Sequence, residues 1–262
     1  MKRSFLVFIA LLCACIYSLP AFSWGQKGHR IIAKIAYDHL TCKARKSVDA
    51  IAGKQGIIYW ANWPDEIKSD TIYPTSYDWH FQDFDGGLSD SVVVAALTDY
   101  PKEGGNMFRA LDSLKNLLGN KAENEVHNLR FFVHLTGDRY CPMHTAHMDD
   151  KGGNAVKMKW FKEDTRLHTV WDTHLIESQG YSFSEYAEML ELRYAAQRKA
   201  IEQMSDEELL LYNYHFTEAI YAYQQTWDGN TYHYIYRWHE PMEWQLYAAG
   251  IRLAQLLNQI YK

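Results

Sequence analysis

Residues 131–144, FFVHLTGDRYCPMH, constrain this chain more than any other segment. His134 and Asp138 are four residues apart, so on a helix both side chains project from one face. Pro142 ends the helical run and lets His144 turn back toward the same point. Two imidazoles and a carboxylate that converge in this way are ligands for zinc or a similar borderline ion. A capped helix with two surface histidines has the same pattern, so the rest of the chain must decide between the two interpretations.

Helical patterns dominate the remainder of the sequence. Period-two alternation is scarce, and residues 92–94, three valines, form the only strand-like run. The helical segments are residues 31–36, a segment from an N-cap at Thr41 to Gly53, Met107–Gly119, a segment that begins with a capping box at Ser205, and a last helix that follows Pro241. We therefore predict one all-α, multi-helix domain over residues 24–262, with long functional loops and no linker.

The first 23 residues have the pattern of a secretion signal. Lys2 and Arg3 precede an apolar run at residues 5–16, and Ala21 to Ser23 form a small-x-small cleavage site. The run is too short to span a bilayer, so we expect cleavage after Ser23 and an exported protein, periplasmic or secreted, with no membrane span. A lipoprotein box that ends at Cys15 is the alternative.

Charge and cysteine content limit the function further. Loss of Lys2 and Arg3 with the leader would take the formal net charge from −5 to −7. An acidic chain is a poor candidate for binding nucleic acid through a basic surface, so a phosphate substrate would need local positive charge such as bound metal supplies. Cys42 and Cys141 would remain, and a disulfide between them is left open.

Cleavage after Ser23 would give Trp24 a free α-amino group. The amine has an ordinary pKa near 8 (roughly 7.7–8.0), so a metal readily takes its neutral form, and amine and carbonyl together close a five-membered chelate ring. His29 lies five residues on and could complete such a site. A lipidated leader would turn the amine into an amide, which is why simple cleavage is preferred. The alternative is that Trp24 is only the first core residue.

Two further segments carry candidate ligands beside candidate substrate contacts. Asp65 precedes Lys68 by three residues, so on a helical turn the ammonium lies near the carboxylate and can contact a phosphate; a helix cap with a surface lysine is the alternative. His80 is a candidate ligand, with Phe81 next to it as a stacking face for a base and Asp83 as an acceptor for the base edge. Taken alone, Phe81 fits a core residue better than a stacking face.

His168 and Asp172 repeat the spacing of His134 and Asp138. With His144 they would form one more site of two imidazoles and a carboxylate, open to water. Asn154 follows two glycines and could donate a hydrogen bond to a phosphate oxygen. We expect structural or surface roles for the other histidines, and core packing for the aromatic residues Trp227, Tyr232, Tyr234, Tyr236 and Trp238.

Six motifs stand in order along the chain. They are Trp-Gly-x-x-Gly-His from residue 24, Trp-x-Asp-x-x-Lys from 63, His-Phe-x-Asp from 80, His-x-x-Gly-Asp-x-x-x-Pro-x-His from 134, Gly-Gly-Asn from 152 and His-x-x-x-Asp from 168. In these motifs and in its ending, Ala-Gly-Ile-Arg-Leu-Ala-Gln-Leu-Leu-Asn, the chain resembles the zinc-dependent single-strand nuclease and 3′-nucleotidase family of fungi, plants and bacteria.

The resemblance implies a mainly helical fold of the phospholipase C/nuclease type around three zinc ions. One zinc would be bound by Asp65, His80, His134 and Asp138, a second by Trp24, His29 and the shared Asp138, and a third by His144, His168 and Asp172. Phe81 and Asp83 would hold a base, Lys68 and Asn154 would contact phosphate, and Asp65 would orient the attacking water. The implied substrates are single-stranded DNA and RNA, cut to 5′-phosphate products, and 3′-nucleotides; no stable protein partner is implied.

The sequence departs from the family at one place. Where the family usually has Gly-Asp-x-His-Gln-Pro-Leu-His, this chain has Arg139, Tyr140 and Cys141 before the proline and Met143 after it. The ligands are kept and the groups behind them differ, which bears on rate and metal affinity.

Two other classes remain open. A zinc phospholipase C shares the fold, but its first histidine usually lies further from the tryptophan and its last motif ends in Glu, unlike His29 and Asp172 here. A protein that uses zinc only to fold would not need Lys68, Phe81 and Asn154.

Overall fold

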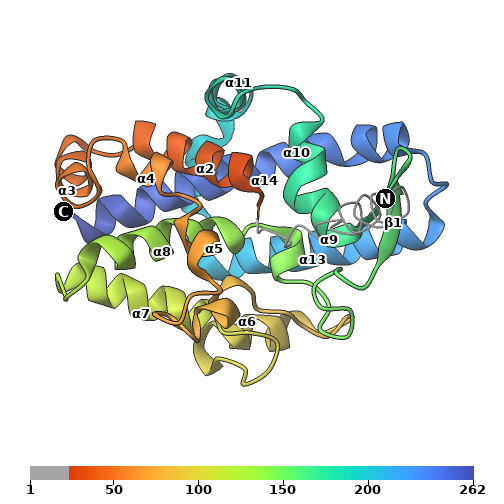
Figure 1. Cartoon of the computed structure of the whole chain (residues 1–262), viewed down its shortest axis with the longest axis horizontal. Helices are drawn as coiled ribbons and strands as arrows, with labels where there is room; N and C mark the ends of the chain where they lie inside the picture. The colour runs from red at the N-terminus through yellow and green to blue at the C-terminus, as the bar shows by residue number, and fades with distance from the viewer. Residues whose placement is uncertain (1–23) are drawn as a thin grey trace, which may run out of the picture.

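The computed structural model describes residues 24–262 (Figure 1). The signal peptide, the cleavage after Ser23 and the lipoprotein alternative at Cys15 lie outside these residues. The first half contains α2 (Gln26–Asp38), α3 (Cys42–Ala52), α4 (Gly56–Tyr59), α5 (Trp63–Ile67), η1 (Ser76–His80), α6 (Asp90–Asp99), α7 (Met107–Gly119) and α8 (Glu125–Asp138). The second half contains η2 (Pro142–His144), β1 (Lys157–Trp160), β2 (Glu163–Arg166), α9 (Leu167–Thr169), η3 (Val170–His174), α10 (Leu175–Glu177), α11 (Phe183–Tyr194), η4 (Ala195–Gln197), α12 (Arg198–Gln203), α13 (Asp206–Thr226) and α14 (Thr231–Ile260).

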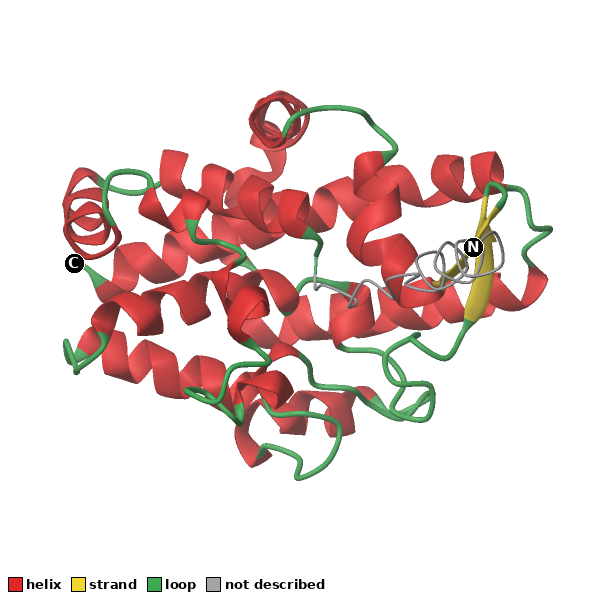
Figure 2. Ribbon diagram, viewed as in Figure 1, coloured by secondary structure: helices red, strands yellow, loops and turns green. Residues whose placement is uncertain are grey.

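The prediction of an all-α fold is confirmed. Helices make up nearly all of the regular structure, and β1 and β2 form one small antiparallel hairpin at an end of the molecule (Figure 2). Helix α14 packs along α2, α8 packs on α7 and also contacts α2, and α6 lies against α13. Gly250 allows the closest of these approaches, since a Cβ there would lie 2.6 Å from Ile35.

Local signals set several helix ends as the sequence predicts. The Thr41 hydroxyl accepts a hydrogen bond from the Ala44 backbone N–H (3.2 Å), and the helix ends at Gly53, whose φ of 84° favours glycine. Ser205 and Glu208 form the predicted capping box of α13. Helix α7 has the predicted bounds, Met107–Gly119.

Two expectations about secondary structure are wrong, and in both cases tertiary packing overrides the local pattern. The valines at 92–94 lie in helix α6, which buries Val93 rather than pairing as a strand. The last helix begins at Thr231, where the Asn230 side chain caps it. The helix continues past Pro241 because the packing of its buried face stabilises it on both sides of the proline.

The aromatic residues near the C-terminus also divide between two environments. Tyr234 and Trp238 are buried as predicted, but Tyr232 and Tyr236 on the opposite face of α14 are 70% and 91% exposed. No helix among the described residues is both long and apolar enough to cross a membrane.

Candidate metal centre

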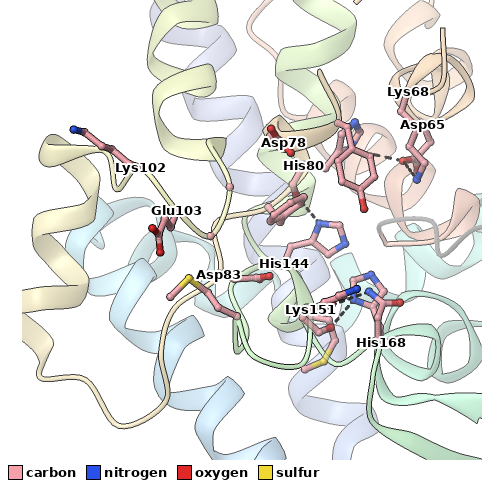
Figure 3. A pocket seen from close by; sticks show the side chains of 18 residues that line it. Asp65, Lys68, Asp78, His80, Asp83, Lys102, Glu103, His144, Lys151 and His168 are labelled. Atoms are coloured by element: carbon pink, nitrogen blue, oxygen red, sulfur yellow. Dashed lines mark hydrogen bonds and ion pairs between the residues drawn. The ribbon is translucent and has the colours of Figure 1, made fainter. Parts of the chain in front are cut away.

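Many of the residues singled out from the sequence line one cavity of about 940 Å³; they are Asp65, Lys68, His80, Phe81, Asp83, His144, Asn154 and His168. They come from α5 and the residue after it, from η1 and the chain after it, from η2, from the loop before β1 and from α9. Figure 3 shows Asp65, His144 and His168 turned toward the same space, while Lys102 extends away from it at the rim. Segments up to about a hundred residues apart in the sequence therefore meet in one site.

The first predicted ligand set forms a buried cluster. Nε2 of His134 lies 3.4 Å from Asp138 Oδ2 and 3.7 Å from Asp65 Oδ1, and Nδ1 of His80 lies 3.1 Å from the same Asp138 oxygen. The other ring nitrogen of His134 faces the Ala61 carbonyl at 2.7 Å, which leaves Nε2 to the cluster. Asp65, His80 and His134 each place a ligand atom within 4.8 Å of the others.

Asp138 connects this cluster to a second one. Its Oδ1 lies 3.2 Å from Nε2 of His29, whereas its Oδ2 faces His80 and His134. The rings of His29 and His134 stack with centroids 3.8 Å apart. The indole N–H of Trp24 donates to the Gly137 carbonyl (2.9 Å), which fixes this buried residue against α8. One carboxylate thus has an oxygen for each of two neighbouring sites.

The third predicted set lies opposite. His168 Nε2 is 2.9 Å from Asp172 Oδ2, and His144 Nε2 is 3.8 Å from Asp172 Oδ1. The Nδ1 atoms of His168 and His144 face the carbonyls of Gly152 (2.6 Å) and His80 (2.5 Å). Because the second nitrogen of each ring is held by a carbonyl, both Nε2 atoms are directed toward Asp172.

Burial sets the protonation of the first set. It lowers the pKa of His134 to about 3, and it raises the pKa of Asp138 well above its usual range. It also raises the pKa of Asp65 to about 6, although the Lys68 ammonium 3.3 Å away acts in the opposite direction. These imidazoles are therefore neutral near pH 7, as metal ligands must be.

Two ligand nitrogens in the centre have no hydrogen-bond partner. Among the described residues, His80 Nε2 and His144 Nε2 are buried polar atoms in this state. Orphaned buried acceptors are costly unless something satisfies them. Clustered nitrogen and oxygen lone pairs of this kind fit zinc in donor type and spacing.

The predicted substrate contacts lie on the open side of the cavity. Phe81 is in an extended conformation, half-buried, with Tyr77 packed edge-on at 5.8 Å. Asp83 is buried and accepts a hydrogen bond from the Ala146 N–H (3.3 Å); burial raises its pKa to about 8. Asn154 lines the cavity, and its amide donates to the Lys151 carbonyl (2.9 Å).

Two glycines next to Phe81 escaped the sequence analysis. A Cβ on Gly105 would lie 2.1 Å from the Phe81 carbonyl oxygen, and one on Gly104 would lie 2.3 Å from that of Asp83. Both glycines have positive φ, 113° and 79°. Only glycine lets this loop close on the Phe81–Asp83 segment, and the doubled glycine is the signal that could have revealed it.

The disulfide left open by the sequence is absent between the two described cysteines. Cys42 is an exposed free thiol on α3 and Cys141 is a buried free thiol. The Cys141 sulfur lies 3.3 Å from Asp172 Oδ1, and Cys141, His144 and Asp172 together form a potential metal-binding group. Of the other residues that depart from the family pattern, Tyr140 and Met143 are both buried.

Comparison with known proteins places this centre in a family. The S1/P1 nuclease family model matches residues 24–262. Endonuclease 3 of Arabidopsis thaliana is 28% identical over 92% of this chain and 90% of its own length. Nuclease S1 of Aspergillus oryzae is 30% identical over 64% of this chain and 62% of its own, and nuclease P1 of Penicillium citrinum is 26% identical over 58% of each.

The chain belongs to the S1/P1 nuclease family. Members of this family are hydrolases that act on phosphodiester bonds, and the chain is an enzyme of that class. The family is zinc-dependent, in keeping with the clusters of histidine and aspartate at the cavity.

Proposed function

We propose that the chain is an exported nuclease with three zinc ions that hydrolyses single-stranded DNA and RNA to 5′-phosphate products and removes the 3′-phosphate of nucleotides. The observation that carries the proposal is the position of Asp138. One oxygen faces His29 and the other faces His80 and His134, and two ligands of the third set, His144 and His168, line the neighbouring cavity. Such an arrangement suits a pair of neighbouring cations and a third one opposite.

Each zinc has its own set of proposed ligands. Asp65, His80, His134 and Asp138 hold the first, Trp24, His29 and Asp138 the second, and His144, His168 and Asp172 the third. The Trp24 contribution, through amine and carbonyl, requires a chain that begins at residue 24, so it rests on the proposed cleavage after Ser23. Bound zinc would supply positive charge to the phosphate and lower the pKa of water toward neutrality.

The side chains around the cavity supply the remaining functions. Asp65 accepts a hydrogen bond from the attacking water and so orients it, and the Lys68 ammonium, 3.3 Å from that carboxylate, contacts the phosphate. Asn154 donates a hydrogen bond to a phosphate oxygen from the edge of the cavity. Phe81 stacks on a base whose edge Asp83 holds, and a base must leave its stack to reach them, which favours single strands.

The two alternatives differ in substrate. A zinc phospholipase C would cleave phosphatidylcholine, and a protein that only folds around zinc would cleave nothing. The purified protein is assayed on single-stranded DNA, RNA, 3′-AMP and phosphatidylcholine, with and without chelator. We expect chelator-sensitive cleavage of the first three. Cleavage of phosphatidylcholine alone, or of no substrate with zinc bound, would reject the proposal.

Base recognition has a separate test in Phe81→Ala. Loss of one stacking contact, about 1–3 kcal/mol per base, should slow cleavage of polymer and of 3′-nucleotides and leave a base-free activated phosphodiester unaffected. Zinc content should not change, because Phe81 is not a ligand. If Phe81 were core packing, the loss of about 3–5 kcal/mol of stability would lower the melting temperature and slow all substrates together.

A further inference from the structure

Cys141 lies between two segments that each end in a proposed zinc ligand. It lies in the short connection between α8, which ends at Asp138, and η2, which ends at His144. Its N–H donates to the Asp138 carbonyl (2.9 Å), and its own carbonyl accepts from the His144 N–H (3.0 Å). The backbone of Cys141 is therefore hydrogen-bonded to two residues, Asp138 and His144, that are proposed ligands of different zinc ions.

The side chain of Cys141 contacts a ligand of the third proposed zinc site. The thiol is fully buried and donates its S–H to Asp172 Oδ1 at 3.3 Å, across 31 residues of sequence. The same oxygen lies 3.8 Å from His144 Nε2, while the other oxygen faces His168 Nε2 at 2.9 Å. The thiol is thus a hydrogen-bond donor to Asp172 that is not itself one of the proposed ligands.

The thiol is the donor that reaches Asp172 Oδ1 within hydrogen-bond distance. Without the S–H, nothing else in the described side chains would donate to Oδ1 from that direction except His144, at a longer distance.

We propose that Cys141 is a positioning residue for the third zinc site: its S–H fixes the rotation of the Asp172 carboxylate so that the carboxylate meets His144 and His168. This inference rests on the proposed zinc ligands. In the family pattern this position is usually Gln, whose amide N–H is a stronger donor, so the chain keeps a donor but a weaker one. Groups that orient ligands in this way typically change metal affinity by about 10–100-fold.

Substitutions at residue 141 separate the hydrogen bond from packing. Cys141→Ala and Cys141→Ser remove a similar volume, but only Ser keeps a donor. Chelator competition should show that Cys141→Ala lowers the affinity for one of the three zinc ions by about 10–100-fold. Cys141→Ser should retain most of that affinity. Cys42→Ser, at the exposed thiol, is the matched control and should bind zinc like the wild type. Equal weakening in Ala and Ser, or no weakening in Ala, would overturn the proposal.

Cobalt substitution distinguishes positioning from direct ligation. A thiolate ligand gives an intense sulfur-to-cobalt charge-transfer band. We expect no such band in the cobalt-loaded wild type; a band that Cys141→Ser abolishes would overturn the proposal and make Cys141 a ligand.

A measurement on metal-free protein is independent of the proposed function. The S–H stretching band of Cys141, identified by its loss in Cys141→Ser, should shift to higher frequency in Asp172→Ala because the hydrogen bond is gone. An unchanged band would contradict the hydrogen bond itself. A shift in a protein that holds fewer than three zinc ions would instead leave the bond standing and reject the zinc assignment.

Discussion

Two His–Asp pairs with the same four-residue spacing belong to the candidate metal centre, and they differ in local structure, in distance and in pKa. His134 and Asp138 lie on the regular helix α8 and are completely buried. His168 lies on the short helix α9, and Asp172 on the π-helical segment η3 that follows it. The first pair is 3.4 Å apart and the second 2.9 Å.

The charge states of the two pairs differ as well. Burial lowers the pKa of His134 to about 3. Burial also acts to lower the pKa of His168, but the Asp172 carboxylate outweighs it and the pKa is raised. In the absence of metal the second imidazole therefore takes up a proton at a higher pH than the first. Identical spacing in sequence therefore specifies a common face of a helix and leaves the electrostatics to the surroundings.

The largest effect should follow from Asp138→Asn. Because its two oxygens face the ligands of two sites, the variant should lose two zinc ions together. Loss of that charge removes several kcal/mol of transition-state stabilisation, a fall in activity of roughly 10³-fold or more. Elemental analysis and steady-state kinetics measure both, with Asp164→Asn, an exposed carboxylate on β2, as control. Loss of a single zinc would mean that Asp138 is not shared.

An extra residue retained before Trp24 should affect the second proposed zinc site, which shares Asp138 with the first. It would convert the α-amine into an amide and remove one nitrogen from the second site only. We expect the loss of one zinc ion and of most activity, whereas an extension at the C-terminus should leave both intact. Full zinc content in the extended protein would remove the amine from the ligand set.

Asp172→Asn should have a smaller effect, confined to the third proposed zinc site. The proposed ligands that its oxygens face are His144 and His168, so one zinc should be lost and the pair around Asp138 retained. We expect activity to fall by about 10–100-fold, less than in Asp138→Asn. Loss of all zinc from this variant would show that the two sides do not bind metal separately.

Histidine titration of the metal-free protein should give the smallest effect. NMR should find His168 protonated above pH 6.5 and His134 neutral down to about pH 3. The raised pKa of His168 contributes stability that is fully present below pH 6.5 and lost as pH rises through the folded value. The lowered pKa of His134 has the opposite effect on stability: it destabilises the folded state as pH falls below 6.5. Similar pKa values for both would contradict the comparison.

The parts of the molecule that the sequence predicts are those that local chemistry determines. A hydroxyl at Thr41, a glycine at Gly53 and the i, i+4 spacing each act within one or two turns, and all three features hold. Helix α14 passes through Pro241 because long-range packing outweighs a local rule.

Features of the site that depend on distant segments were beyond the sequence. The contact of Cys141 with Asp172 and the closure of Gly105 on Phe81 exist only once remote loops meet. The charge difference between the two pairs is of the same kind, since it depends on burial and on the neighbours that the fold supplies.

The central claim is that both His–Asp pairs belong to one cluster of three zinc ions, and zinc content tests it most directly. Elemental analysis of the wild type, purified without chelator and beginning at Trp24, should give three zinc ions per chain. Asp138→Asn should retain one and Asp172→Asn two. One zinc ion or none in the wild type would contradict the account.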